Sequence, residues 1–126
     1  MTRLATPKKP RPFRLTMPEA PESDIQRGVL RVLALHPKVA RAWRTNTGAG
    51  KLQIGDGKTS RWMRFGFEGQ PDICGFMKDG RALFIEAKRP SGRVRTAQAA
   101  FIEQAQGHGC VALIVRNSAD VWEALK

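Results

Sequence analysis

Apolar residues first recur with helical spacing near the start of the chain, at every third or fourth position from Ile25 to Leu33. Ser23 and Gln26 stand at the beginning of this run in the arrangement of a capping box, in which a hydroxyl and an amide satisfy free donors at a helix start. Pro37 follows the run, and the residue before a proline avoids the helical conformation. The pattern therefore predicts a helix that begins near Ser23 and ends before Pro37.

Shorter apolar stretches follow and predict strands. Residues 39–45 and 61–67 are predicted strands, and the polar, glycine-rich residues 46–58 between them are predicted to form a long loop. Asp79-Gly80 is a strong tight-turn signal between two further apolar stretches, so residues 72–88 predict a β-hairpin. A basic loop, a helix that Thr96 caps, a buried strand and a short helix are predicted to follow, at residues 89–95, 96–107, 110–115 and from 118.

The predicted elements follow the order α-β-β-β-β-α-β-α. The strand, helix, strand passage within residues 81–115 favours a right-handed crossover, and so an α/β fold with a mixed central sheet flanked by helices. Residues 1–21 contain five of the eight prolines and lack a core-forming period, so they are predicted to be a flexible basic arm before one domain at residues 22–126. The arm is either a tether to DNA phosphates or a solvated tail without a role.

The charge of the chain points to a polyanionic partner. Lysine and arginine number 22 against 11 acidic residues, a net charge of +11. Phosphates attract such a surface, and the release of counterions drives binding. Cys74 and Cys110 form no C-x-x-C pair, so a thiolate zinc site is not expected, and two reduced, buried thiols are favoured over a disulfide. The sequence has no apolar run of membrane-spanning length and no apolar stretch of a signal peptide at its start.

The candidate chemistry lies in the predicted hairpin. Pro71-Asp72 is followed, after thirteen residues, by Glu86-Ala87-Lys88. Glu86 and Lys88 are two apart on a strand and so share a face, and the turn brings this strand back toward Asp72. Carboxylate oxygens suit Mg²⁺, with Mn²⁺ as a substitute, and the Ala87 carbonyl is a plausible third ligand. Lys88 is predicted to orient or deprotonate a water molecule, or to balance charge on the phosphate. The competing interpretation is a solvated Glu–Lys pair, but Glu86 interrupts an apolar run, and a charge in a core-type strand needs a reason.

Other residues have simpler interpretations. Trp43, Trp62 and Trp122 are expected in the core or a lid, and His36 and His108 at the surface or at a helix end. Cations on or beside the 46–58 stretch and directly after Lys88 are predicted to contact the DNA backbone, namely Lys51, Lys58, Arg61, Arg64, Arg89, Arg93 and Arg95.

A spaced set of motifs resembles the stand-alone VRR-NUC nucleases of the PD-(D/E)xK superfamily, which are common in phages and bacteria. The set extends from residue 22 to about residue 117 and consists of Glu22-Ser-Asp-Ile-Gln26, Arg44-Thr-Asn46-Thr-Gly48, Gly69-Gln-Pro71-Asp72, Glu86-Ala-Lys88 and Gln98. The resemblance implies metal-dependent cleavage of phosphodiester bonds in branched or otherwise structured DNA such as four-way junctions. It also implies a homodimer and a location in the bacterial or host cytoplasm.

The resemblance changes the interpretation of four residues. By themselves, Glu22 is explained by the positive end of a helix dipole and Gln98 by a first helical turn. The resemblance implies an active site at Glu22, Asp72, Glu86 and Lys88, where Glu22 is a further or second-metal carboxylate and Gln98 an orienting amide. Arg44 and Asn46, which belong to the same set of motifs, are assigned as further DNA contacts.

Three functions remain open from the sequence. The first is a Mg²⁺-dependent DNA endonuclease, the second is a DNA-binding protein without catalysis whose carboxylates are structural, and the third is a nuclease or binder that acts on RNA. Asp72→Asn separates the first two, because it should stop cleavage but not DNA binding. The third depends on contacts to 2′-hydroxyl groups.

Overall fold

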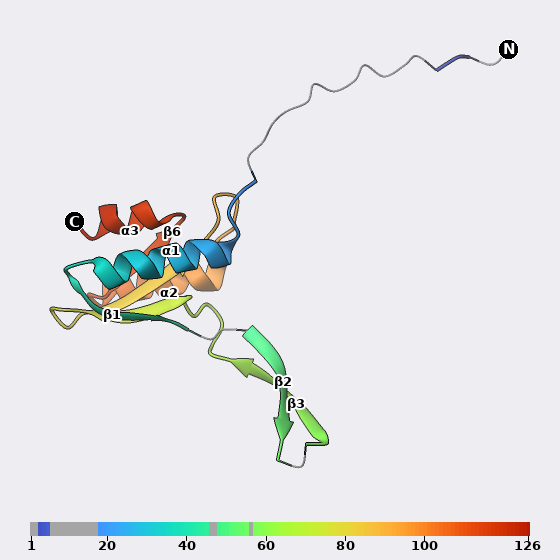
Figure 1. Ribbon diagram of the computed structural model, residues 1–126, viewed down its shortest axis with the longest axis horizontal. Coiled ribbons are helices and arrows are strands. Elements are labelled where there is room, and N and C mark those ends of the chain that lie inside the picture. The colour runs from blue at the N-terminus through green and yellow to red at the C-terminus, as the bar shows by residue number, and fades with distance from the viewer. Residues whose placement is uncertain (1–2, 6–17, 46–47, 56) are drawn as a thin grey trace.

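A computed structural model describes residues 3–5, 18–45, 48–55 and 57–126 (Figure 1). Its helices and strands, in chain order, are α1 (Glu22–Leu35), β1 (Val39–Arg44), β2 (Gly48–Ile54), β3 (Thr59–Phe65), β4 (Ile73–Met77), β5 (Ala82–Ala87), α2 (Thr96–Gly107), β6 (Val111–Val115) and α3 (Ser118–Ala124). Most of the predicted arm at residues 1–21, and Asn46, lie outside the described residues. None of the helices in the described ranges is long and apolar enough to span a membrane.

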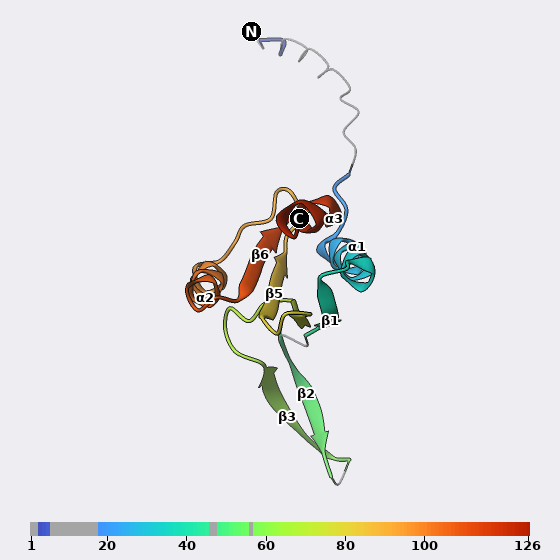
Figure 2. The same ribbon diagram turned by 90° about the vertical axis from the view of Figure 1, so that its left-hand side faces the viewer.

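The central sheet has four strands in the order β1-β4-β5-β6. The β1–β4 and β4–β5 pairs are antiparallel, whereas β5 and β6 are parallel and are connected through α2. Figure 2 shows the sheet between α2 on one side and α1 with α3 on the other. The predicted mixed sheet flanked by helices is therefore confirmed.

The alternation of side chains along β5 builds a core on each face of the sheet. Leu83 and Ile85 are fully buried in the larger core, which includes Val29 and Leu33 of α1. Phe84 points to the opposite face, where it packs against α2 in a smaller apolar cluster. Burial of a side chain of this size contributes about 1.5–3 kcal/mol, so both helix layers are held by the same strand. Glu86 continues the alternation at the end of β5.

Residues 46–58 were predicted to be a loop, and this prediction was wrong for most of them. Residues 48–54 form β2, which pairs with β3 in a two-stranded antiparallel ribbon. The predicted order of elements therefore lacks one strand. Strand β2 begins with glycine and alanine residues. A strand is usually predicted from apolar side chains that alternate because one face is buried in a core, and this sequence lacks that alternation. Backbone pairing with β3 makes the strand without such a core.

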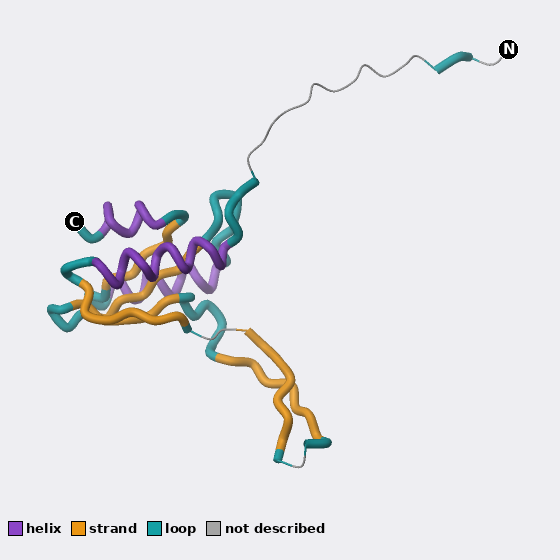
Figure 3. The backbone as a smooth tube through the Cα atoms, viewed as in Figure 1, coloured by secondary structure: helices purple, strands orange, loops and turns teal. Residues whose placement is uncertain are grey.

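The ribbon projects away from the central sheet (Figures 1 and 3). Among the described helices and strands, β2 and β3 make extensive contact only with each other. The register pairs Lys51 with Trp62 and Leu52 with Arg61. Directly paired residues share a face of an antiparallel ribbon, so these two pairs lie on opposite faces.

Several local predictions need correction. Helix α1 begins at Glu22 after Pro21, without a side-chain cap bond, so Ser23 lies in the first turn and forms no capping box. Helix α2 is preceded by Arg95, not capped by Thr96. Both helices start within one or two residues of the predicted position, which is the range over which helix ends commonly vary.

The aromatic and sulfur-containing side chains are also less buried than expected. Trp43, Trp62 and Trp122 are 44%, 67% and 47% exposed, so none is a core residue. Cys74 and Cys110 are free thiols, as predicted, but both are only partly buried. His36 does end α1, yet it is buried, with its ring 4.8 Å from that of Trp122. The small sheet leaves little interior volume, which the aliphatic side chains fill first.

Candidate active site

The β4–β5 hairpin brings the two predicted metal ligands to one end of the sheet. Ile73 lies opposite Ile85, so Asp72, one residue before β4, is level with Glu86 near the end of β5. The Asp72 Oδ2 atom accepts a hydrogen bond from the Ala87 backbone N–H at 3.1 Å. The predicted convergence of these residues is therefore present, and the backbone of β5 orients the Asp72 carboxylate directly.

A third carboxylate joins them from the first turn of α1. One oxygen atom each of Glu22, Asp72 and Glu86 lie within 4.8 Å of one another. Glu22 is partly exposed, whereas Glu86 is 1% exposed. The three carboxylates therefore include one buried and one partly exposed potential metal ligand. They lie where the start of α1 meets the end of β5.

Lys88 lies beside this cluster. Its Nζ atom is 3.5 Å from Glu86 Oε1 and 3.9 Å from Glu22 Oε1, and the residue is 7% exposed. Its backbone N–H donates to the Val115 carbonyl at 2.9 Å, which continues the β5–β6 pairing by one residue. A buried ammonium group next to two carboxylates balances only part of their charge.

The electrostatics of Glu86 favour a cation beside its carboxylate. Burial, reinforced by the negative charge of Asp72, raises the pKa of the Glu86 carboxyl from 4.5 to about 8, although Lys88 opposes this rise. The Glu86 Oε2 atom is buried and has no hydrogen-bond partner among the described residues. A buried carboxylate oxygen without a partner is costly. The donor set, all hard oxygen atoms, fits a divalent cation such as Mg²⁺, which would supply the absent partner.

Gln98, predicted to be an orienting amide, is hydrogen-bonded to Glu86. Its Nε2 atom donates to Glu86 Oε1 at 2.8 Å, and its Oε1 atom accepts from the Arg95 backbone N–H at 3.0 Å. Both ends of the amide are therefore occupied. The side chain fixes the Glu86 carboxylate relative to the start of α2.

Two supporting residues had no assigned role in the sequence interpretation. The Thr45 backbone N–H donates to the Asp72 carbonyl at 2.8 Å, and its hydroxyl donates to the Pro71 carbonyl. Gly69 has a φ angle of 85°, and a Cβ atom there would lie 2.5 Å from the Ala97 carbonyl oxygen. Thr45 and Gly69 therefore hold the segment before Asp72 against β1 and α2. Both belong to the motifs that carry the family resemblance, which was the available signal.

A basic groove adjoins the carboxylates. It has a volume of about 390 Å³ and is lined by Pro21, Glu22, Lys88, Arg89, Gly92, Arg93 and Arg95. The Arg116 Nη1 atom donates to the carbonyls of Arg89 at 2.7 Å and Gly92 at 2.8 Å, and so fixes the loop that carries these arginines. This structural role of Arg116 was not recognised from the sequence. The predicted DNA contacts at Arg89, Arg93 and Arg95 thus lie beside the candidate active site.

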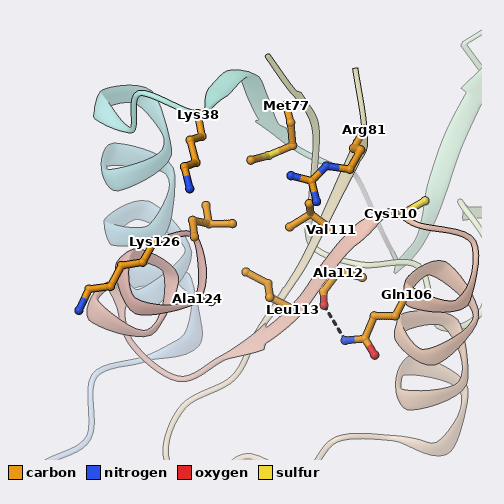
Figure 4. Close-up of a pocket in the computed structure, with 11 residues that line it drawn as sticks. Lys38, Met77, Arg81, Gln106, Cys110, Val111, Ala112, Leu113, Ala124 and Lys126 are labelled. Carbon is orange, nitrogen blue, oxygen red and sulfur yellow. Dashed lines mark hydrogen bonds between the residues drawn. The ribbon is translucent and has the colours of Figure 1, made fainter. Parts of the chain in front are cut away.

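The remaining predicted DNA contacts that the structure describes lie on β1 and on the ribbon, and Arg44 is opposite Ile73, the residue after Asp72. Arg44 ends β1 and is exposed, and Lys51, Lys58 and Arg61 are exposed residues of the ribbon and its turn. Arg64 lies on β3 next to them. A further pocket of about 330 Å³, under Lys38, Arg81 and Lys126, has an apolar floor and no carboxylate in its lining (Figure 4). Within the described residues, the one group of carboxylates that could hold a metal ion lies at the end of the β4–β5 hairpin, beside the start of α1.

The fold and this end of the sheet define the class of protein. A mixed sheet whose central hairpin carries Pro71-Asp72 and Glu86-Ala87-Lys88 has the PD-(D/E)xK-like arrangement. The family model described as VRR-NUC domain matches residues 22–119, so the chain belongs to the VRR-NUC family, a family of nucleases. No curated protein and no solved structure matches the chain.

Proposed function

We propose that this protein is a Mg²⁺-dependent endonuclease that hydrolyses phosphodiester bonds in branched DNA. The observation that carries the proposal is the convergence of Glu22, Asp72 and Glu86 beside Lys88, with a buried oxygen atom of Glu86 left without a partner. The ion pair with Lys88 engages Glu86 Oε1 and does not account for the buried Oε2 atom. Membership in a nuclease family supports the same chemistry.

Each residue of the cluster has a part in this proposal. Asp72, Glu86 and the Ala87 carbonyl would hold the divalent cation, with Glu22 as a further ligand. When bound, such a cation supplies the positive charge that activates water and stabilises the phosphate. Lys88 orients the attacking water or neutralises charge on the phosphate, because its Nζ atom lies at the edge of the cluster. Gln98 keeps Glu86 in position.

The basic surfaces on either side of the cluster would hold the DNA. Arg89, Arg93 and Arg95 line the groove next to Lys88, where a phosphate backbone would pass close to the carboxylates. Arg44, Asn46, Lys51, Lys58, Arg61 and Arg64 would extend the contact along β1 and the ribbon. Binding through so many cations should weaken steeply with added salt.

A homodimer would allow two cuts at one branch point. One domain with one site cuts one strand at a time, and a twofold axis supplies the second site. Leu52 and Met63 are 41% and 39% exposed and lie on the same face of the ribbon. A two-stranded ribbon is marginally stable by itself, so we assign the apolar side chains of this face, Leu52 and Met63, to contact with a second copy of the chain, with Arg61 on the same face as a cation beside that contact.

The function is tested by cleavage of single-stranded, duplex, flap and four-way DNA of equal length. Mg²⁺ or Mn²⁺ should support cleavage, with four-way DNA preferred, and Ca²⁺ should support binding with little turnover because its looser geometry positions water poorly. Full activity in excess EDTA would refute the metal role. Cleavage of RNA in preference to all of these DNA substrates would show that the protein is an RNA nuclease instead.

The homodimer is tested by sedimentation at micromolar concentration. Met63→Glu should give a monomer, since it places a charge in the apolar face. Ser60→Glu is the matched control because Ser60 pairs with Gln53 on the opposite face. A wild-type protein that sediments as a monomer and nicks linear duplex as fast as junctions would contradict the preference for branched DNA as well.

A further inference from the structure

The ribbon emerges directly beside the candidate active site. Thr45, one residue after β1, donates hydrogen bonds to the carbonyls of Pro71 and Asp72. The chain that enters the ribbon is therefore held next to Asp72, a candidate metal ligand. The chain that leaves the ribbon turns at Phe67 and Gln70, whose backbone N–H donates to the Phe67 carbonyl at 3.1 Å, and then reaches Asp72. DNA held at the carboxylates therefore lies within reach of the ribbon.

One face of the ribbon carries an aromatic ring among polar and cationic residues. Trp62 pairs with Lys51, and the next pair on the same face is Gln53 with Ser60. Trp62 is 67% exposed, more than Trp43 or Trp122, and the described residues show no ring stacked on it. The opposite face, with Leu52 and Met63, is the one already assigned to the second copy.

This combination fits unpaired nucleotides. Every base has a π face that can stack on an aromatic side chain, and a neighbouring cation can hold the adjacent phosphate. Paired bases inside a duplex do not offer that face, whereas the unpaired bases of a fork or flap do, and bases at a four-way branch point offer it once their pairs open. Trp62 lies three residues before the end of β3, which places it about 10 Å along the ribbon, or roughly three nucleotides of DNA.

We propose that Trp62 stacks on an unpaired base near the cut site, with Lys51 on the neighbouring phosphate. Trp62 and Lys51 together would favour binding of DNA that has unstacked nucleotides close to the scissile bond. This inference deepens the proposed function, because it names the feature of branched DNA that the protein recognises. It also explains why a large aromatic side chain is exposed on an otherwise polar face.

The test uses the Asp72→Asn background, which is expected to bind DNA without cutting it. Forked DNA carries a fluorescent purine analogue at successive unpaired positions next to the fork, and its emission falls when an aromatic ring stacks on it. The variants are Trp62→Ala, Trp62→Phe and, as the matched control, Trp122→Ala, which removes an exposed tryptophan from α3. Affinity for forked DNA and for fully paired duplex is measured in parallel.

Trp62→Ala should abolish the emission change and weaken binding to forked DNA about tenfold, while duplex affinity stays the same. Trp62→Phe should retain most of both effects, and Trp122→Ala should behave as the background does. An unchanged emission signal in Trp62→Ala would overturn the inference, as would an equal loss for forked and duplex DNA. A changed sedimentation coefficient of free Trp62→Ala would overturn it too, because Trp62 would then belong to an interface between copies.

The outcome is separable from that of the proposed function. Cleavage is scored on the wild-type protein, whereas stacking is scored on a variant without the Asp72 carboxylate. Wild-type protein that cuts branched DNA without a Trp62-dependent signal would refute the stacking role alone. A Trp62-dependent signal with a wild-type protein that cuts no DNA would refute the nuclease function and leave the stacking role supported.

Discussion

The carboxylate cluster and the β2–β3 ribbon lie next to each other but are built in opposite ways. Glu86 and Lys88 are buried at the end of a central strand, and their side chains contact one another, α1 and α2. Trp62, Leu52 and Met63 are exposed on strands that, among the described elements, make extensive contact only with each other. The cluster is fixed by the core of the protein, whereas the ribbon presents exposed side chains on both of its faces. Chemistry that depends on exact ligand geometry needs a rigid, buried setting such as that of the cluster. Binding of a substrate or of another copy of the chain is compatible with the exposed ribbon.

The largest expected difference concerns the chemical step. Asp72→Asn should lower the rate of DNA cleavage at least about 1,000-fold, because it removes an anionic ligand from the cluster while its remaining oxygen can still accept from Ala87. DNA affinity should change little. The measurement is single-turnover cleavage together with binding by fluorescence anisotropy. Asp79→Asn, in the exposed turn of the same hairpin, is the control and should cleave normally.

The ribbon should open far more readily than the central sheet. Amide hydrogens of β2 and β3 should exchange on the order of several hundredfold faster than those of β4 and β5 in dilute protein, because no core supports the ribbon. Hydrogen exchange followed by mass spectrometry measures this difference. Protection of the ribbon should increase with protein concentration if a second copy covers Leu52 and Met63. Equal protection of the ribbon and the central sheet from hydrogen exchange at every protein concentration would contradict this prediction.

Lys88→Met should lower kcat about a hundredfold while leaving the affinity for Mn²⁺ largely intact. Methionine preserves much of the buried volume but lacks the ammonium group that lies 3.5 Å from Glu86. Calorimetric titration with Mn²⁺ and steady-state cleavage separate the two quantities. Lys78→Met, at the exposed end of β4, should change neither. Normal turnover in Lys88→Met would show that Lys88 is structural.

The smallest expected effect is a gain in stability. The pKa of Glu86 is raised from 4.5 to about 8, so the folded state disfavours the ionised carboxylate and loses stability as the pH rises between these values. Without metal, Glu86→Gln should therefore be more stable than the wild type near pH 8, by about 2 kcal/mol or several degrees in Tm, and nearly equal near pH 5. Thermal unfolding in EDTA at both pH values measures the difference.

Glu103→Gln, on the exposed side of α2, is the control for that experiment and should not show the pH-dependent gain. Mg²⁺ should raise the Tm of the wild type near pH 8 but not that of Glu86→Gln, because only the wild type can use the carboxylate as a ligand. A Glu86→Gln variant that is less stable than the wild type near pH 8 in EDTA would show that the carboxylate is satisfied without a cation.

Sequence reasoning predicted the two regions unequally well, for a physical reason. Buried strands such as β4 and β5 need apolar side chains, and the tight turn at Asp79-Gly80 sets their register, so the alignment of Asp72 with Glu86 was predictable. Residues 48–54 satisfy their backbone groups by pairing with β3 and do not need a core, so their glycine-rich sequence indicated a loop. Because the ribbon was not predicted, Trp62 was expected in the core or in a lid, whereas it is exposed on β3.

The sequence by itself determined the two core faces of the sheet, the hairpin that carries Asp72 and Glu86, and the basic character of the surface. These features follow from local periodicity, turn chemistry and charge, which act over a few residues. The resemblance implied Glu22 and Gln98 at the site, but only the tertiary structure shows the contacts: a Glu22 oxygen near those of Asp72 and Glu86, the Gln98 amide bonded to Glu86 Oε1, and Glu86 Oε2 without a partner. These contacts join the starts of α1 and α2 to the end of β5, and no pattern within a single segment records the packing that brings them together.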